Sequence, residues 1–377
     1  MQLIARTRDP AVGTKSWFWD FHELSFNGAG QAVFDATLQS DLPVEQPDYG
    51  IWAGAAELEV VALAGSLTAE HVERAPGFDV NFSNLFTHPV NDRGGRVAFT
   101  GRLGPSTEVT FANDTGIWSG PVDALALLAR EGAPAPGVPA GMVFDDFEDN
   151  FSVIINGGRI AFYATLLGPG AAEGTDEGVW SNVTGSLTLS ARAGAAAPGT
   201  ETTFFGVGFP ALNAAGQIAF TGVLNAADPE DTVLGIWMQE PNGVVRLVIR
   251  DEDEIRIAGQ LRSVSGISTA GTGGEGGRGS GLNDAGQIVL TGTVGAQRGV
   301  FVTPGADGGG GGGGGNDNDD MDDGQGAPEC APLGSMCGPV MTPFMLALLV
   351  QRVALRRSFR ADLRNRNAGE VSGSAGG

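Results

Sequence analysis

The sequence predicts an all-β protein: a five-repeat β-propeller closed by its N-terminal strand, followed by a disordered linker and a short C-terminal helix. Three observations predict the propeller. An Asn-turn phrase and a Gly-Ile-Trp phrase each occur five times in fixed order, and almost no segment shows helical periodicity. Each unit of about sixty residues holds three or four short strands, which is typical of a propeller blade.

The first phrase joins an Asn/Gly turn to a short apolar strand. It reads NGAGQAVF at 27–34, NDRGGRVAF at 91–99, NGGRIAF at 156–162, NAAGQIAF at 213–220 and NDAGQIVL at 283–290. Asn and Gly tolerate the positive φ of tight turns, and strand-forming residues follow them. We therefore expect repeat turns at Asn27, Asn91, Asn156, Asn213 and Asn283.

The second phrase places an aromatic residue at the same point of every unit. These aromatics are Trp52, Trp118, Trp180, Trp237 and Phe301. They could form a ring of stacking platforms for sugars. Five equivalent positions must also fill five equivalent gaps between blades, so the core interpretation is favoured.

The third phrase, LLAREGAPAPG at 127–137, recurs at 3–13 and 189–199 and more weakly at 60–65 and 247–250. Turn residues separate it from the preceding Trp strand, which predicts a hairpin. The strand at Phe301 lacks such a partner, whereas the chain begins with one. We therefore predict that Leu3–Arg6 pairs with the last blade, because closure removes exposed edges.

Arginines end this strand in four units, at Arg6, Arg130, Arg192 and Arg250. A ring of guanidinium groups at a channel mouth could bind an anion. Pairing with neighbouring carboxylates is favoured in so acidic a body.

The repeats divide the chain into a β domain and a tail. The repeat domain is 1–305, with units at about 1–54, 55–120, 121–182, 183–240 and 241–305. A Gly/Asp-rich linker at 306–329 cannot repay its ordering entropy and is expected to be flexible. The segment 330–366 is expected to be a sorting signal or membrane anchor, and 367–377 a disordered end.

The tail combines two cysteines, an apolar segment at 339–350 and a cluster of six arginines between Arg352 and Arg366. This order resembles the tripartite C-terminal sorting signals of bacterial surface proteins. A plain tail anchor, or an amphipathic helix lying on the ring, is the alternative. Cys330 and Cys337 are expected to be the processing or attachment point, with a disulfide between them as the other interpretation.

The repeated phrases resemble a bacterial tandem-repeat family known mainly from planctomycetes, marked by an Asn-x-x-Gly-x-x-Ala-Phe motif and variable C-terminal anchors. The resemblance covers residues 1 to about 303. It implies export and display at the bacterial cell surface or envelope, and it brings no activity with it. The N-terminal MQLIARTRDPAVGTK has no apolar run of a secretory signal, so we expect export to require a start upstream.

The acidic composition restricts the partners. A formal net charge of −22 repels phosphate backbones, so nucleic acid is excluded as a partner of the repeat domain. An extracellular glycan or protein, and the membrane through the C-terminal segment, are the partners expected. No cofactor is expected with certainty. Calcium is a weak candidate, at Asp145, Asp146, Asp149, Asp319 and Asp323.

No arrangement of nucleophile and base stands out in the sequence, so we expect a non-enzymatic binding or structural module anchored at the cell surface, and not an enzyme. The alternative is an extracellular, glycosidase-like carbohydrate-active enzyme. Acid clusters at 145–149, 229–231 and 251–254 supply the paired carboxylates that glycoside hydrolysis needs.

Overall fold

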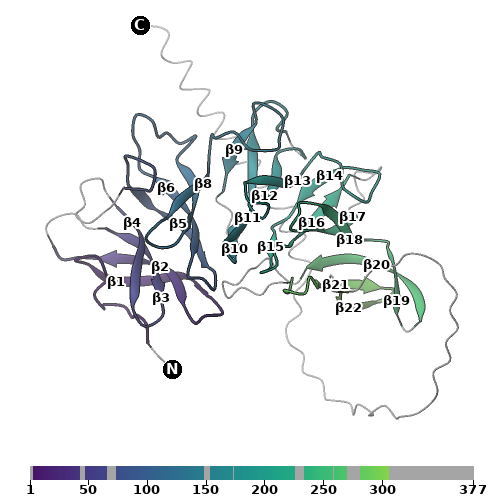
Figure 1. Cartoon of the computed structure of the whole chain (residues 1–377), viewed down its shortest axis with the longest axis horizontal. Helices are drawn as coiled ribbons and strands as arrows, with labels where there is room; N and C mark the ends of the chain where they lie inside the picture. The colour runs from purple at the N-terminus through teal and green to yellow at the C-terminus, as the bar shows by residue number, and fades with distance from the viewer. Residues whose placement is uncertain are drawn as a thin grey trace, which may run out of the picture. The chain divides into compact units, whose positions relative to one another are not determined.

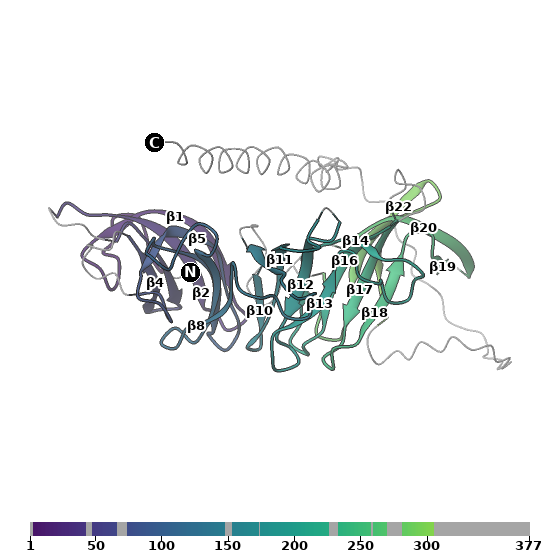
Figure 2. The same cartoon turned by 90° about the horizontal axis from the view of Figure 1, so that it is seen from above.

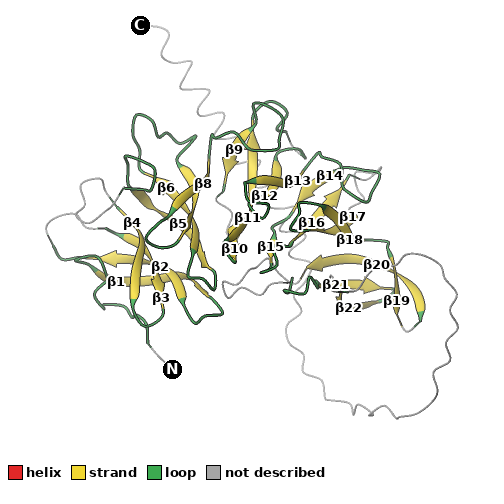
Figure 3. Cartoon of the chain, in the orientation of Figure 1, coloured by secondary structure: helices red, strands yellow, loops and turns green. Residues whose placement is uncertain are grey.

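The structure is a computed structural model that describes residues 3–42, 47–65, 74–147, 153–172, 174–225, 233–257, 259–269 and 281–304. All of them belong to one compact unit, Met1–Gly311. The described residues form strands, turns and loops and no helix, which confirms the all-β prediction (Figures 1 and 3). No helix of this part of the chain could cross a membrane.

Several predictions concern residues outside the described ranges. These are the linker at 306–329, the segment 330–366 with its predicted helix, the end at 367–377, Cys330, Cys337, Asp149, Asp319 and Asp323.

The described strands form five consecutive antiparallel meanders, numbered here 1 to 5 (Figures 1 and 2). Meander 1 contains β1 (Trp17–Phe26), β2 (Ala32–Gln39), β3 (Tyr49–Gly54) and β4 (Leu58–Ala64). Meander 2 contains β5 (Phe82–Asn91), β6 (Val97–Leu103), β7 (Thr115–Gly120) and β8 (Ala126–Arg130). One parallel residue pair, Ala64 with Phe82, joins these two meanders.

In meanders 3 and 4 the first strand is interrupted. Meander 3 contains β9 (Val143–Asp146), β10 (Val153–Asn156), β11 (Arg159–Leu167), β12 (Glu177–Ser181) and β13 (Thr188–Arg192). Meander 4 contains β14 (Phe204–Val207), β15 (Ala211–Leu212), β16 (Ile218–Leu224), β17 (Val233–Gln239) and β18 (Val245–Arg250). Both pieces of each interrupted strand pair with the second strand, β11 or β16.

Meander 5 has the first three strands of the pattern. They are β20 (Gln260–Thr269), β21 (Val289–Val294) and β22 (Gln297–Val302). An additional strand, β19 (Glu254–Ile257), pairs with β20 at the other edge. No fourth strand lies beside β22 among the described residues.

The predicted hairpin between the Trp strand and the L-x-A-R strand is confirmed in meanders 1 to 4. Each of these pairs has a register shift immediately before the tryptophan. The expected units are out of phase with the sheets by one strand. The predicted boundaries at 54/55, 120/121, 182/183 and 240/241 separate the third strand from the fourth strand that pairs with it.

The tryptophans of the repeated phrase are fully buried; they are Trp52, Trp118, Trp180 and Trp237. Each indole N–H donates a hydrogen bond of 2.9–3.2 Å to a backbone carbonyl in the loop before its own meander; the acceptors are Val12, Pro76, Pro136 and Pro198. Each ring also packs edge to face on the first strand, against Phe18, Phe82, Phe144 or Phe204. Phe301 is only partly buried.

The hydrophobic core lies between successive meanders. One cluster, for example, joins Val179 and Ala191 of meander 3 to Phe204, Phe220 and Trp237 of meander 4. Similar clusters join meanders 1 and 2, 2 and 3, and 4 and 5. Burial of apolar surface between neighbours therefore fixes the order of the meanders.

The Asn turns follow one hydrogen-bond pattern, with one correction. Asn27 Oδ1 accepts from the N–H groups of Ala29 and Gln31, and Asn283 accepts in the same way; Asn213 Oδ1 accepts from the N–H of Gln217. In meander 2 this acceptor is Asp92, not the predicted Asn91, which ends β5. The prediction was wrong by one residue because an aspartate carboxylate can accept the same two hydrogen bonds.

Asn156 also ends its strand. It pairs with Arg159 across a two-residue turn in which Gly157 and Gly158 have φ of 57° and 75°. Positive φ at both positions gives the tight hairpin turn that glycine permits.

The predicted pairing of Leu3–Arg6 with β22 is not formed in this structure. Leu3–Arg6 form no strand, and Ile4 and Ala5 pack instead beside the cluster of Phe18, Phe34 and Trp52 in meander 1.

Candidate functional site

Carboxylates gather at one end of the sheets, opposite the Asn turns. At this end, which we call the acidic end, the second strand of a meander finishes, the third begins and the fourth finishes. In meander 2 it carries Asp114 and Glu131, and in meander 3 Asp145, Asp146 and Glu177.

Glu131 is the most perturbed carboxyl of meander 2. It directly follows β8, is partly buried, and its Oε2 accepts a hydrogen bond of 3.3 Å from the N–H of Thr115. Burial, followed by the negative charges of Asp114, Asp146 and Asp145, raises its pKa to about 7. The Glu131 carboxyl is therefore protonated in a fraction of the molecules at neutral pH.

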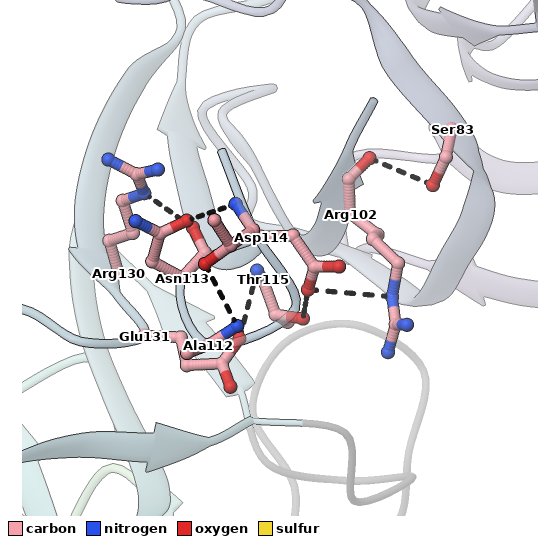
Figure 4. A network of polar contacts seen from close by, with 9 residues as sticks. Ser83, Arg102, Ala112, Asn113, Asp114, Thr115, Arg130 and Glu131 are labelled. Atoms are coloured by element: carbon pink, nitrogen blue, oxygen red, sulfur yellow. Dashed lines mark hydrogen bonds and ion pairs between the residues drawn. The ribbon is translucent and has the colours of Figure 1, made fainter. Parts of the chain in front are cut away.

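The neighbouring Asp114 has a different environment (Figure 4). It is buried, accepts a hydrogen bond of 3.1 Å from the hydroxyl of Thr115, and lies 3.9 Å from the guanidinium Nε of Arg102. The backbone carbonyl of Arg102 accepts a hydrogen bond from Ser83. Thr115 thus contacts both carboxyl groups, through its hydroxyl on Asp114 and its N–H on Glu131.

Glu177 is the second perturbed glutamate. It begins β12, and its Oε2 accepts a hydrogen bond of 3.2 Å from the hydroxyl of Tyr163. Burial, followed by the charge of Asp176, raises its pKa to about 7, against the opposing effects of Tyr163 and the backbone of Val207. A hydroxyl and a proton-holding carboxyl therefore lie together in meander 3.

Two further buried carboxyls have raised pKa values with burial as the largest cause. Asp35 accepts hydrogen bonds from the Tyr49 hydroxyl and the Glu23 N–H, and burial also raises the pKa of Tyr49. Asp251 accepts from the N–H groups of Leu234 and Ile267 at 3.2 and 3.1 Å. Asp251 therefore ties together the backbones of two neighbouring meanders.

The repeated arginines do not form an open ring of guanidinium groups. Arg6 and Arg250 form ion pairs with the aspartates three residues later, Asp9 and Asp253. Arg130 Nε donates to the carbonyl of Asn113 at 2.7 Å, and Arg192 Nη1 to that of Thr175 at 3.0 Å. Two of the four repeated arginines, Arg6 and Arg250, therefore pair with carboxylates, as the acidic composition favoured.

The two calcium candidates within the described residues, Asp145 and Asp146, do not belong to a metal site. Within the described ranges, no group of three or more His, Cys, Asp or Glu side chains could hold a metal ion. Asp145 and Asp146 lie instead at the end of β9, and their charges act on Glu131.

Glu131 and Glu177 were not among the site residues predicted from the sequence, because both are single acids inside repeated phrases and lie outside the acid clusters. The available signal was positional. Glu131 stands where the other phrases have Thr7, Ala64, Ala193 and Asp251, and Glu177 stands directly before the Gly-Val-Trp phrase. An acid that replaces a small residue in a repeat is a departure from the framework.

A shallow cavity of about 340 Å³ lies at the opposite end, beside the turns of meanders 1 and 2. Gln31, Glu57, Glu59 and Asn91 are among its lining residues. Its lining includes neither Glu131 nor Glu177, so the perturbed carboxyls and this cavity are separate features.

Most of the chain matches one protein-family model. A family model described as a family of unknown function (DUF7453) matches residues 1–69 and 64–304. The chain belongs to this family. The match covers the five meanders and the N-terminal segment. Among proteins with curated descriptions, none matches the chain.

Solved structures with similarity to this chain include three carbohydrate-active enzymes. An α-L-arabinanase from Penicillium chrysogenum, complexed with arabinobiose, is 11% identical over 79% of this chain and 80% of its own, with a TM-score of 0.28. An α-L-arabinofuranosidase from Fusarium graminearum is 8% identical over 78% and 82%, with a TM-score of 0.30. The polysaccharide lyase Uly1 is 10% identical over 78% and 70%, with a TM-score of 0.34.

These findings correct the expectation that the protein is a non-enzymatic binding or structural module. The solved structures reported above are glycosidases and a lyase. At these TM-scores the likeness assigns neither an activity nor a blade count. Within the chain itself, burial raises the pKa of Glu131 and of Glu177 to about 7, and neither residue was among the site residues predicted from the sequence.

Proposed function

We propose that the protein is a carbohydrate-active enzyme that hydrolyses glycosidic bonds at the acidic end of meanders 2 and 3. The observation that carries the proposal is Glu131, a partly buried carboxyl with a pKa of about 7 beside three other carboxylates. Glycoside hydrolysis needs one carboxyl that donates a proton and a second that stays ionised.

In this proposal Glu131 is the general acid. Its proton passes to the oxygen of the leaving sugar as the glycosidic bond breaks, and its raised pKa keeps that proton available near neutral pH. The ionised partner comes from Asp114, Asp145 or Asp146, whose charges act on Glu131. That carboxylate attacks the anomeric carbon directly or deprotonates a water that attacks it.

The remaining polar groups would orient these carboxyls. Thr115 holds Asp114 through its hydroxyl and Glu131 through its backbone N–H, so both depend on the start of β7. Arg102 lies on the other side of Asp114, with its Nε 3.9 Å from the carboxylate. The site therefore rests on strand ends, which hold side chains more rigidly than long loops do.

The five meanders are proposed to be the blades of a propeller. Support comes from the repeated order of strands and from contacts between the first strands of meanders 1, 2, 3 and 4. In a propeller, the loops at one end of every blade surround one mouth.

Surface display remains a further proposal. It is supported by the order of cysteine, apolar segment and arginine cluster after residue 330. An enzyme displayed there would meet extracellular polysaccharide.

The test is hydrolysis of a panel of neutral and acidic polysaccharides by the full chain, measured as new reducing ends. We expect cleavage of at least one glycan, and a loss of roughly 10² to 10⁴-fold in kcat/KM for Glu131→Gln. A folded protein that cleaves none of the panel, or a Glu131→Gln variant with full activity, would refute the proposal.

Asp251→Asn is the matched control. Asp251 occupies the same position after the repeated arginine as Glu131 and also accepts a hydrogen bond from the start of a third strand. Its pKa is raised chiefly by burial, with Glu252 as the only carboxylate among the causes. We expect this variant to lower the melting temperature and leave kcat/KM unchanged, which separates catalysis from framework.

A further inference from the structure

Among the described residues, meander 5 ends in a strand, β22, that is paired on one side only. In meanders 1 to 4 the third strand pairs on both sides, with the second and the fourth strand. Among the described residues β22 pairs with β21 alone, and Val300 and Val302 are 72% and 58% exposed. Their counterparts in meander 4, Ile236 and Met238, are buried. Within the described ranges, Val300 and Val302 on β22 are therefore apolar side chains that no other residue covers.

The first meander has the complementary free surface. Leu24 pairs with Phe34 and Phe26 with Ala32, so Leu24 and Phe26 lie on the same face of the sheet as Phe34. Both are more than half exposed, at 70% and 51%. This is the face that, in meanders 2 to 4, packs on the preceding meander.

The Asn turns show the same missing neighbour. The side chain after each turn glycine lies over the turn glycine of the next meander. The pairs, with their closest distance to a Cβ built on the glycine, are Gln31 on Gly95 (3.4 Å), Arg96 on Gly158 (3.4 Å), Arg159 on Gly216 (3.1 Å) and Gln217 on Gly286 (2.7 Å). No described atom lies within 4 Å of that position on Gly30, the first glycine of the series, although its φ of 84° matches the others. Gln287, the last side chain of the series, has no turn glycine of a following meander to cover.

The N-terminal segment already has the geometry that follows a fourth strand. The N–H of Arg6 donates to Asp9 Oδ2 at 3.1 Å, as the N–H of Arg250 donates to Asp253 Oδ2 at 2.9 Å after β18. Arg8 and Glu252 then take matching positive φ values of 70° and 76°. The turn after Leu3–Arg6 therefore has the same geometry as the turn that follows the fourth strand β18.

We infer that meander 5 binds meander 1 of the same chain, with Leu3–Arg6 as a fourth strand beside β22, a pairing that this structure does not form. The register follows from the four complete hairpins, in which the residue before the aromatic pairs with the third residue of L-x-A-R, and the aromatic pairs with the first. The pairs are Gly299 with Arg6, Val300 with Ala5 and Phe301 with Leu3. The bulge lies at Ile4, and Gln287 covers Gly30.

This interface is tested by a disulfide in the full chain, with Cys330 and Cys337 replaced by serine. Residues directly opposite in an antiparallel pair have Cα atoms about 4.5–5.5 Å apart, within the range that a disulfide spans. We expect the Ala5→Cys, Val300→Cys variant to lose both free thiols on mild oxidation and to remain a monomer by size-exclusion chromatography.

The matched control is Ala5→Cys with Gln297→Cys. Gln297 lies three residues before Val300 on the same strand, which moves the thiol by roughly 10 Å. We expect its thiols to remain free. Free thiols in the Val300 variant, equal crosslinking in both variants, or a disulfide-linked dimer would overturn the inference; the dimer would assign the interface to a second copy.

A second measurement uses two glycines with the same φ of 84°. No described atom lies within 4 Å of a Cβ on either Gly30 or Gly170. In the proposed interface only Gly30 meets another side chain, that of Gln287. We therefore expect Gly30→Ala to lower the melting temperature more than Gly170→Ala, and Gln287→Ala to reduce the difference. Equal losses for the two glycines would contradict the contact.

Discussion

Tyr163 donates a hydrogen bond of 3.2 Å to the carboxylate of Glu177, and the equivalent positions of meander 1 hold the same pair with its members exchanged. There the carboxylate, Asp35, lies on the second strand, and the hydroxyl, of Tyr49, begins the third. A mutual contact between two strand positions allows either strand to supply the acid.

Replacement of Glu177 by glutamine is predicted to change the pH dependence of stability. The folded chain raises the pKa of Glu177 from 4.5 to about 7, so the folded state binds this proton more tightly than the unfolded state. Its favourable contribution is complete below about pH 4.5 and is lost as the pH rises through 7. Glu177→Gln should therefore be more stable than the wild type near pH 8, by roughly 3 kcal/mol, and similar at low pH.

Urea unfolding at several pH values measures this difference. Tyr163→Phe is the control, because it removes the hydrogen bond that favours the charged form of Glu177 and should steepen the loss of stability with pH. A flat difference between wild type and Glu177→Gln across the pH range would contradict the assignment.

The repeat phrases were enough to predict the strands, because each phrase combines a turn with a strand of defined length. They did not fix the phase of the sheets, since the turn after each Trp strand and the Asn turn are both short and neither marks the break between two sheets. The aspartate at Asp92 was missed for a related reason. Asn91 matches the motif by letter, whereas the hydrogen bonds select the residue whose side chain can reach two N–H groups.

The candidate site was harder to predict. Glu131 owes its pKa first to burial and then to carboxylates from two meanders, and neither contribution is visible in a run of sequence. Asp145 and Asp146 were identified as part of an acid cluster, both as weak calcium candidates and as carboxylates of the alternative, glycosidase-like enzyme. Their relation to Glu131 depends on β9 lying beside the end of β8, which only the packing of meander 3 on meander 2 establishes.

Removal of one buried tryptophan is predicted to destabilise the whole domain. Trp180 is fully buried, packs on Phe144 and Phe162, and donates a hydrogen bond to Pro136. Trp180→Ala should reduce the free energy of unfolding by about 3 to 5 kcal/mol. Trp19→Ala, at a site 55% exposed, should change it by less than about 1 kcal/mol, and denaturant unfolding compares the two. Equal losses would contradict the core position of Trp180.

The turn at Asp92 is predicted to distinguish alanine from asparagine. Asp92 Oδ1 accepts from Gly94 and Arg96, and Oδ2 accepts from the N–H of Gly158 in the next meander at 2.6 Å. Asp92→Ala leaves three donors without this acceptor and should cost about 2 to 3 kcal/mol in unfolding free energy. Asp92→Asn keeps the local turn, as Asn27 does, and should cost less. Equal costs would show that only the contact to Gly158 matters.

The pH profile of hydrolysis tests whether Glu131 donates the proton. If it does, kcat/KM falls as the pH rises above about 7, because the protonated form of Glu131 is lost. Asp145→Asn removes one of the negative charges that raise this pKa, so the descending limb should move to lower pH whatever happens to the maximal rate. Glu108→Gln, at an exposed position, should leave the limb in place. A descending limb that stays fixed in Asp145→Asn would assign the proton donor to a different carboxyl. Glu177 would be the next residue to replace, because its pKa is also about 7 and the carboxylate that acts on it is Asp176.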